Sequence, residues 1–134
     1  MFAGQIAANV IAPYALLRQM PPLLLETKGQ VIVNSSRALP ATAGLGQYAA
    51  TKDAMKAIAD PTTRSQCGWR RRHGAFLGRS ASERQRAIFA AKGRPYPPDR
   101  LIQPPDVAGL VRFLLLLPRT TEVTDIVMRP MLKT

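Results

Sequence analysis

The segment QVIVNSS, residues 30–36, restricts the fold of this chain more than any other stretch. Its centre, residues 31–33, is a run of three β-branched side chains, which favour a strand. A run without polar alternation is typical of a strand that is buried on both faces of a parallel sheet. Helical patterns precede it over residues 2–19 and follow it over 47–60. A buried strand between two helices predicts an α/β fold with a parallel sheet.

Turn and cap signals divide the rest of the chain, and together the elements fit one domain spanning residues 1–134. Prolines mark three breaks: a kink at Pro13, an end or a new turn at Pro21 and Pro22, and a helix end at Pro61. The sequence also predicts a turn over 26–30 with Gly29 at positive φ, a short strand that ends in AFLGR, 75–79, and a closing strand over 121–131. Two further helices are predicted, one over 80–92 with Ser80 as N-cap and Glu83 in a capping box, and one over 104–118 with Pro105 in its first turn.

Cysteine, histidine and hydropathy patterns exclude several classes of protein. Cys67 is the only cysteine and His73 the only histidine, so an internal disulfide cannot form and a Cys or His metal site is not expected. Gln5 and Asn9 interrupt the first apolar run, which also lacks the basic start of a signal peptide. The later run FLLLLP is far too short to span a bilayer. We therefore expect a cytoplasmic protein with no membrane partner.

The net charge of +11 makes nucleic acid or an anionic surface the alternative class of partner. The arginines crowd the stretch Arg64–Arg86, in which Glu83 is the only acidic residue. Aromatic side chains are sparse there, whereas base-stacking surfaces usually need more of them. An arginine run without a recognisable motif is usually solvated, so nucleic acid is not the expected partner. Retention on DNA that falls steeply with salt would favour this alternative.

Tyr48 and Lys52 are four residues apart, on one face of the predicted helix 47–60. A phenol is a poor acid or base at neutral pH, but a nearby ammonium stabilises the phenolate. Such a pair can exchange a proton with a substrate oxygen. The same spacing arises by chance in many helices, where the lysine is simply solvated. The pair therefore needs a second signal before it indicates a site.

The order of motifs around the pair supplies that signal. Asn9 lies in the first helix, a strand that follows Gly29 ends in Ser35–Ser36, and QYAATK, 47–52, comes after a loop that contains glycine. This order resembles the short-chain dehydrogenase/reductase family, in which a helix with Asn precedes a strand ending in a serine pair and then a Tyr-x-x-x-Lys helix. Residues 2–60 carry the resemblance, and FLGRSAS and QPPDVAGLVRFLL match more loosely.

The resemblance implies an oxidoreductase that uses NAD or NADP on an alcohol or carbonyl substrate, with a doubly wound parallel sheet. Tyr48 would be the catalytic acid and base, and Lys52 would stabilise its phenolate and hold the nicotinamide ribose. Ser36 would hydrogen-bond the substrate oxygen. Ser35 is the alternative, because the loop to Tyr48 is about a residue shorter than in many relatives. Asn9 would support a proton-relay water near the lysine.

Two positions in the looser part of the match would reach the cofactor. Gly78 and Ser82 fall where the loop of the family meets the nicotinamide, although Leu77 stands in place of the usual proline. Each candidate also has a structural explanation when taken alone. Asn9 is close to the kink at Pro13, and a serine at a strand end often hydrogen-bonds the next loop.

The family binds the phosphates of its cofactor with a glycine-rich turn after the first strand of the fold. No G-x-G-x-x-G or G-x-x-x-G-x-G motif occurs in the 134 residues. The sequence therefore predicts a partial doubly wound sheet that lacks its N-terminal dinucleotide-binding half, and an inactive fragment. Strand 30–36 would then have one open apolar edge, which favours aggregation or pairing with a second copy.

Residues 61–75 fit neither the helix before them nor the strand that relatives have there. A one-base shift across QCGWRRRH permits Asn-Ala-Asp-Gly-Val-Ala-Val-Thr, which is a helix end, a turn and a strand. We therefore hypothesise that this stretch is translated out of frame. Charges in place of an apolar strand cannot be buried unpaired. The hypothesis predicts that 61–75 is exposed and irregular, or a helix extension, and not a central strand.

Overall fold

A computed structural model gives the structure of the chain and describes residues 2–36, 46–59 and 72–132. Three strands form one parallel sheet in the order β1-β2-β3. β1 is Val31–Ser36, β2 is Arg72–Leu77 and β3 is Asp125–Met128. The α/β fold with a parallel sheet, predicted from the sequence, is confirmed.

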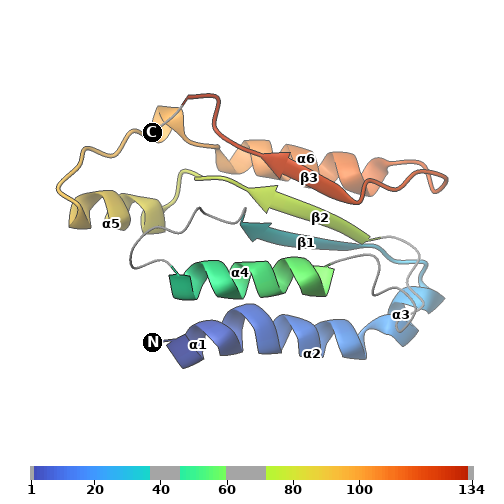
Figure 1. The fold of residues 1–134 in the computed structure, drawn as a ribbon. Coiled ribbons are helices and arrows are strands. Elements are labelled where there is room, and N and C mark those ends of the chain that lie inside the picture. The colour runs from blue at the N-terminus through green and yellow to red at the C-terminus, as the bar shows by residue number, and fades with distance from the viewer. Residues whose placement is uncertain (1, 37–45, 60–71, 133–134) are drawn as a thin grey trace.

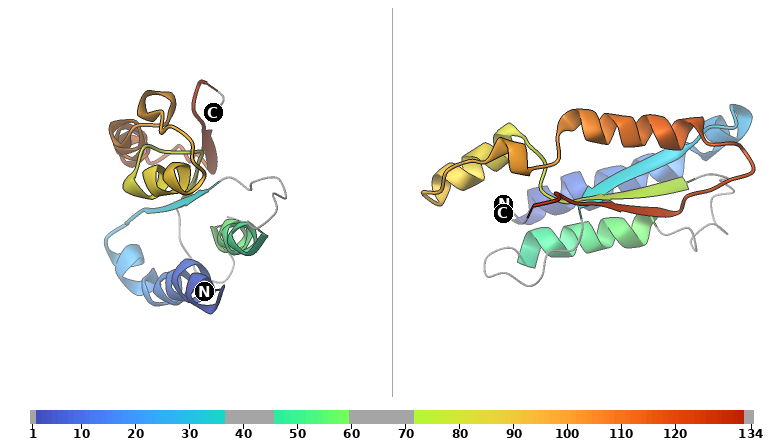
Figure 2. Two further views of the ribbon diagram at one scale, coloured as in Figure 1. Left: turned by 90° about the vertical axis from the view of Figure 1, so that its left-hand side faces the viewer. Right: turned by 90° about the horizontal axis from the view of Figure 1, so that it is seen from above.

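Helices cover both faces of this sheet (Figures 1 and 2). α4, Gly46–Ala59, lies against one face, and α6, Pro104–Leu116, lies on the opposite face. α5, Glu83–Ala91, follows β2 and lies beyond the carboxyl ends of the strands. The other helical segments are α1 Phe2–Ile6, the π-helix Ala7–Ile11, α2 Ala12–Gln19, α3 Pro21–Glu26 and the 3-10 turn Pro98–Arg100. No helix within the described ranges is both long enough and apolar enough to cross a membrane.

The first helical stretch departs from regular α-helical bonding just before its proline. The π-helix Ala7–Ile11 separates α1 from α2, and Pro13 occupies the first turn of α2. Proline has no N–H to donate to the preceding turn, and such a turn often relaxes to wider bonding. The predicted disturbance at Pro13 is therefore present as a π-helical turn. Pro21 and Pro22 start the new helix α3, which was one of the two outcomes expected for them.

The turn after α3 corrects one expectation. Lys28, and not Gly29, has the positive φ, at 51°. Lys28 N–H donates to the Leu25 carbonyl at 3.3 Å and Gly29 N–H donates to the Leu24 carbonyl at 2.8 Å, which is the pattern of a Schellman helix end. A Cβ at Gly29 would lie 2.5 Å from Cδ2 of Leu24, so a larger residue there would require the Leu24 side chain to move.

The start of α5 is also later than expected. Ser82 is the N-cap, and its Oγ accepts the N–H of Gln85 at 3.3 Å. Ser80 instead forms an isolated parallel bridge with Ile102, and its hydroxyl donates to the Gly78 carbonyl at 3.4 Å. The helix cannot begin at Ser80 because that residue is still extended and paired. The prediction of Ser80 as the N-cap is therefore wrong.

β2 contradicts the expectation for residues 72–75, because these residues begin the central strand of the sheet. β2 pairs with β1 on one side and with β3 on the other, and all residues from His73 to Leu77 are buried. The apolar residues Ala75–Leu77 favour a buried strand once neighbours exist on both sides. The remaining part of the predicted irregular segment, 61–71, lies outside the described residues.

The one polar side chain inside β2 that the structure describes has partners. The imidazole of His73 is fully buried. Its Nδ1 lies 2.6 Å from the carbonyl oxygen of Val123, and its Nε2 lies 3.3 Å from Oε1 of Gln30. A buried polar group that is hydrogen-bonded does not carry the cost of an unpaired one. This is why the strand tolerates a residue that the apolar pattern of relatives would not predict.

β1 is the edge of the described sheet, since β2 is its only strand partner among the described residues. Val33 is buried against Met55 of α4, with Val31 and Ile58 packed beside them. On the opposite face of β1, Ile32 is half-buried and Asn34 is exposed. The strand is therefore more fully buried on the face toward α4 than on the other, and its apolar composition exceeds what its surroundings require.

Candidate active site

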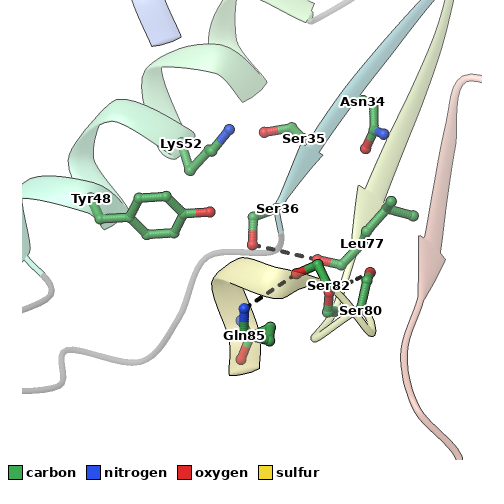
Figure 3. A pocket seen from close by; sticks show the side chains of 10 residues that line it. Asn34, Ser35, Ser36, Tyr48, Lys52, Leu77, Ser80, Ser82 and Gln85 are labelled. Carbon is green, nitrogen blue, oxygen red and sulfur yellow. Dashed lines mark hydrogen bonds between the residues drawn. The ribbon is translucent and has the colours of Figure 1, made fainter. Parts of the chain in front are cut away.

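The carboxyl ends of β1 and β2 border the cavity in which the chemistry-bearing residues meet (Figure 3). This cavity has a volume of about 290 Å³, near the lower end of the range for small-molecule sites. In an open parallel sheet this is the edge at which ligands bind. Its lining residues are Asn34, Ser35, Ser36, Tyr48, Lys52, Leu77, Gly78, Ser80, Ser82 and Gln85.

Tyr48 and Lys52 reach the cavity from the first turns of α4. The helix has no internal glycine or proline before Pro61, so the two side chains share one face one turn apart. The Nζ of Lys52 lies 5.7 Å from the centroid of the Tyr48 ring, and both side chains are half-buried. The pair is thus placed as the sequence predicted.

Ser36 has the position expected of the serine that hydrogen-bonds the substrate oxygen. In Figure 3 its side chain faces the hydroxyl end of Tyr48, and its Oγ donates to the Leu77 carbonyl at 3.4 Å. A substrate oxygen placed between Ser36 and Tyr48 could bond to both hydroxyls.

Ser35 points to a different part of the same cavity. It is 4% exposed, and its Oγ has no hydrogen-bond partner among the described residues. In Figure 3 it faces the amine end of Lys52. A buried hydroxyl without a partner is uncommon and calls for an explanation. A ligand that reaches the Lys52 side of the cavity would satisfy it.

Gly78 and Ser82 line the cavity from the segment that follows β2. Gly78 N–H donates to the Met128 carbonyl at 2.8 Å, and a Cβ at this position would lie 3.0 Å from Cδ of Pro130. A larger residue here would therefore need the chain after β3 to shift by a few tenths of an ångström. Ser82 caps α5, so the positive N-terminal end of that helix is directed at the cavity wall.

The sequence matches no family model and no curated protein. Solved structures do match. An alcohol dehydrogenase from the archaeon Thermococcus sibiricus, complexed with 5-hydroxy-NADP, aligns with 99% of this chain and 55% of its own, with a TM-score of 0.77 and 23% identity. A betaketoacyl-ACP reductase (FabG) from Bacteroides thetaiotaomicron aligns with 97% and 53%, with a TM-score of 0.69 and 23% identity. The closed form of a serine dehydrogenase complexed with NADP+ aligns with 84% and 49%, with a TM-score of 0.64 and 20% identity.

These three proteins are short-chain dehydrogenases/reductases. The fold of this chain matches about half of the fold of these proteins. The chain spans about half the length of the solved structures that it matches. The fold resemblance expected from the motifs is therefore confirmed, whereas the half that the chain lacks stays a prediction.

Five of the six candidate residues line the one cavity: Ser36, Tyr48, Lys52, Gly78 and Ser82. The sixth, Asn9, does not. Its Nδ2 donates to Oγ1 of Thr51 at 3.1 Å, and Thr51 Oγ1 in turn donates to the Tyr48 carbonyl at 2.9 Å. Asn9 thus ties the π-helical turn to the helix that carries Tyr48 and Lys52. π-Helical turns are frequent at functional sites, but a proton-relay role for Asn9 stays a prediction.

The sequence missed four lining residues: Asn34, Leu77, Ser80 and Gln85. A signal existed for the first two, because Asn34 precedes the serine pair and Leu77 ends the strand next to it. Ser80 and Gln85 could not be found, since their position depends on the bridge to Ile102 and on where α5 begins. No group of three or more His, Cys, Asp or Glu side chains in the described ranges could hold a metal ion.

Proposed function

We propose that this chain is a member of the short-chain dehydrogenase/reductase family and carries the alcohol or carbonyl end of an NAD- or NADP-dependent active site. The observation that supports this proposal is the convergence of Ser36, Tyr48 and Lys52 in one cavity, at the carboxyl edge of a sheet with this fold. Neither the motif nor the fold alone would suffice. The match in fold is independent of the motif that suggested it.

In the proposed reaction Tyr48 exchanges a proton with the substrate oxygen. Lys52 acts beside it from the same face of α4, with its ammonium 5.7 Å from the ring centroid. Ser36 donates a hydrogen bond to the same oxygen and so fixes its position beside Tyr48. Asn9, through Thr51, holds the helix that carries the pair. The chain's own residues thus bind, orient and protonate or deprotonate one oxygen.

A nicotinamide cofactor, when bound, accepts or supplies the hydride. Lys52, Gly78 and Ser82 would hold its nicotinamide end. The structure supports a fit there, because the Ser35 hydroxyl is buried, unpartnered and directed to the Lys52 side of the cavity. The 134 residues contain no glycine-rich phosphate motif, so tight dinucleotide binding would require residues beyond them. We propose that the 134-residue chain alone is inactive for this reason.

Two ligands of different length test whether the chain can hold the nicotinamide end of the cofactor but not its phosphates and adenosine. NADP(H) should not bind the 134-residue chain at micromolar concentration, because its phosphates and adenosine find no site. Calorimetric titration measures this, and a micromolar dissociation constant would contradict the proposed inactivity. Nicotinamide mononucleotide, offered at millimolar concentration, should shift the backbone amide signals of Ser35, Lys52 and Gly78 in nuclear magnetic resonance spectra.

The variants separate the proposed site from adventitious binding. Lys52→Met should lose the nicotinamide mononucleotide shifts, whereas Tyr14→Phe, a change on the exposed side of α2, should keep them. Any turnover at millimolar cofactor should vanish in Tyr48→Phe, which removes only the ionisable hydroxyl. Turnover that survives Tyr48→Phe, or shifts that leave the cavity residues unmoved, would rule out the proposed site.

A further inference from the structure

Arg84 has no part in the reaction proposed above, yet it contacts the central residue of that reaction. It lies on the first turn of α5, between the cavity residues Ser82 and Gln85. Its guanidinium carbon is 5.1 Å from the centroid of the Tyr48 ring. The contact joins α5 to α4 beside the cavity, through the Tyr48 ring that lines it, although Arg84 itself is not among the lining residues. An exposed arginine held against a ring has less freedom than a solvated one.

The charges around this contact are uneven. Tyr48 has two cations near its ring, Arg84 and Lys52. No carboxylate belongs to the described residues that line the cavity. Glu83, the nearest acid in sequence, pairs with Arg86 instead, with 3.6 Å between Oε1 and Nε. The positive charge beside the cavity is therefore not balanced by any described ion pair, and it favours an anion.

The proposed reaction assigns Lys52 to Tyr48, so Arg84 is the cation left for the substrate. A cation–π contact uses none of the guanidinium N–H groups in a conventional hydrogen bond, and these donors match a carboxylate in pairs. A single guanidinium also suits the single charge of a carboxylate better than the nearly double charge of a phosphate monoester. The cavity of about 290 Å³ admits small compounds.

We propose that Arg84 binds a carboxylate of the substrate, so that the cavity selects small hydroxy acids or oxo acids over neutral alcohols and carbonyls. This inference rests on the proposed function. Ser36 and Tyr48 would hold the reacting oxygen, and Arg84 would hold the carboxylate. Arg84 is thus a specificity-determining residue that acts on the substrate and not on the proton transfer.

A matched pair of ligands tests the proposal on the 134-residue chain without any turnover. 3-Hydroxybutyrate and 1,3-butanediol share a carbon skeleton and a secondary hydroxyl, and differ in the carboxylate. Their dissociation constants are measured from the amide signals of Ser36, Tyr48 and Gln85. We expect 3-hydroxybutyrate to bind at least tenfold more tightly. Arg84→Gln should reduce that preference to about twofold or less, because the charge is lost while a polar side chain of similar reach remains.

Arg86→Gln is the matched control. Arg86 lies on the same helix with its guanidinium carbon 5.4 Å from the centroid of the Tyr96 ring, so it makes the same kind of contact with a ring that does not line the cavity. Its loss should leave the tenfold preference intact. A preference that survives in Arg84→Gln, or that falls equally in both variants, overturns the role of Arg84. Failure of both ligands to move the cavity signals would instead overturn the proposed function.

Discussion

In both β1 and β2 the composition of the strand disagrees with its position in the sheet, and the two disagree in opposite directions. β1 begins with three β-branched residues, the composition of a central strand, yet it lies at the edge of the described sheet with Asn34 exposed and Ile32 half-buried. β2 begins with Arg72 and His73, the composition of a surface segment, yet it is central and buried from His73 onward.

The difference shows that neighbours decide the burial of a strand as much as its own residues do. β2 is central because β1 and β3 bond to it on both sides, and its apolar end and hydrogen-bonded histidine are compatible with that position. β1 is suited to two covered faces and two strand partners, but the described residues provide one strand partner and cover its second face only in part. An apolar strand with an open edge is typical of a sheet that continues in another segment or another chain.

The largest expected effect tests whether β2 is the centre of the core. Phe76→Ala removes a ring that is 5% exposed in the central strand. It should lower the free energy of unfolding by about 3–5 kcal/mol, the usual cost of emptying a core aromatic position. Val127→Ala on β3, where the side chain is 54% exposed, is the control and should change little. Urea denaturation measures both, and equal losses would show that β2 is not the centre.

A smaller effect tests the buried imidazole. His73→Ala removes the imidazole whose Nδ1 lies 2.6 Å from the Val123 carbonyl oxygen and whose Nε2 lies 3.3 Å from Oε1 of Gln30, and it leaves that carbonyl without its partner. We expect a loss of about 2 kcal/mol in the free energy of unfolding. Asn34→Ala changes an exposed polar residue of β1 and serves as the control. If the two variants unfold at the same urea concentration, His73 does not support the central strand.

The sequence predicted the elements whose signals are local. The strand at 31–36 and the helix at 46–59 follow from apolar runs and from prolines, and the pairing of Tyr48 with Lys52 follows from helical spacing alone. A short strand ending in AFLGR was predicted, and β2 includes Ala75–Leu77 of that segment. Its start at Arg72 and its central place in the sheet could not be predicted, because a strand with polar residues at its start is recognisable only from its two neighbours. The frame-shift hypothesis gave the arginine run too much weight against the apolar residues Ala75–Leu77.

Some residues of the candidate site could likewise be predicted from the sequence, and others could not. Ser36, Tyr48 and Lys52 lie where the motif placed them, since each is fixed by the element that carries it. Ser82 lines the cavity as expected, but its role as helix cap was assigned to Ser80. Arg84 could not be found from the sequence, because its contact with Tyr48 depends on how α5 lies against α4. Such contacts between elements are what a spacing argument cannot supply.

The smallest expected change in stability comes from the open side of β1. Ile32→Lys places a charge on the half-buried face of the edge strand, where lysine commonly protects edges from pairing. It should alter the free energy of unfolding by about 1 kcal/mol or less. Val33→Lys, one residue on, should cost as much as Phe76→Ala, because Val33 is 7% exposed and faces Met55. Sedimentation should show that the unaltered chain associates as its concentration rises and that Ile32→Lys stays monomeric. An equal loss of stability in both lysine variants would mean that this face of β1 is covered, and the contrast with β2 would then disappear.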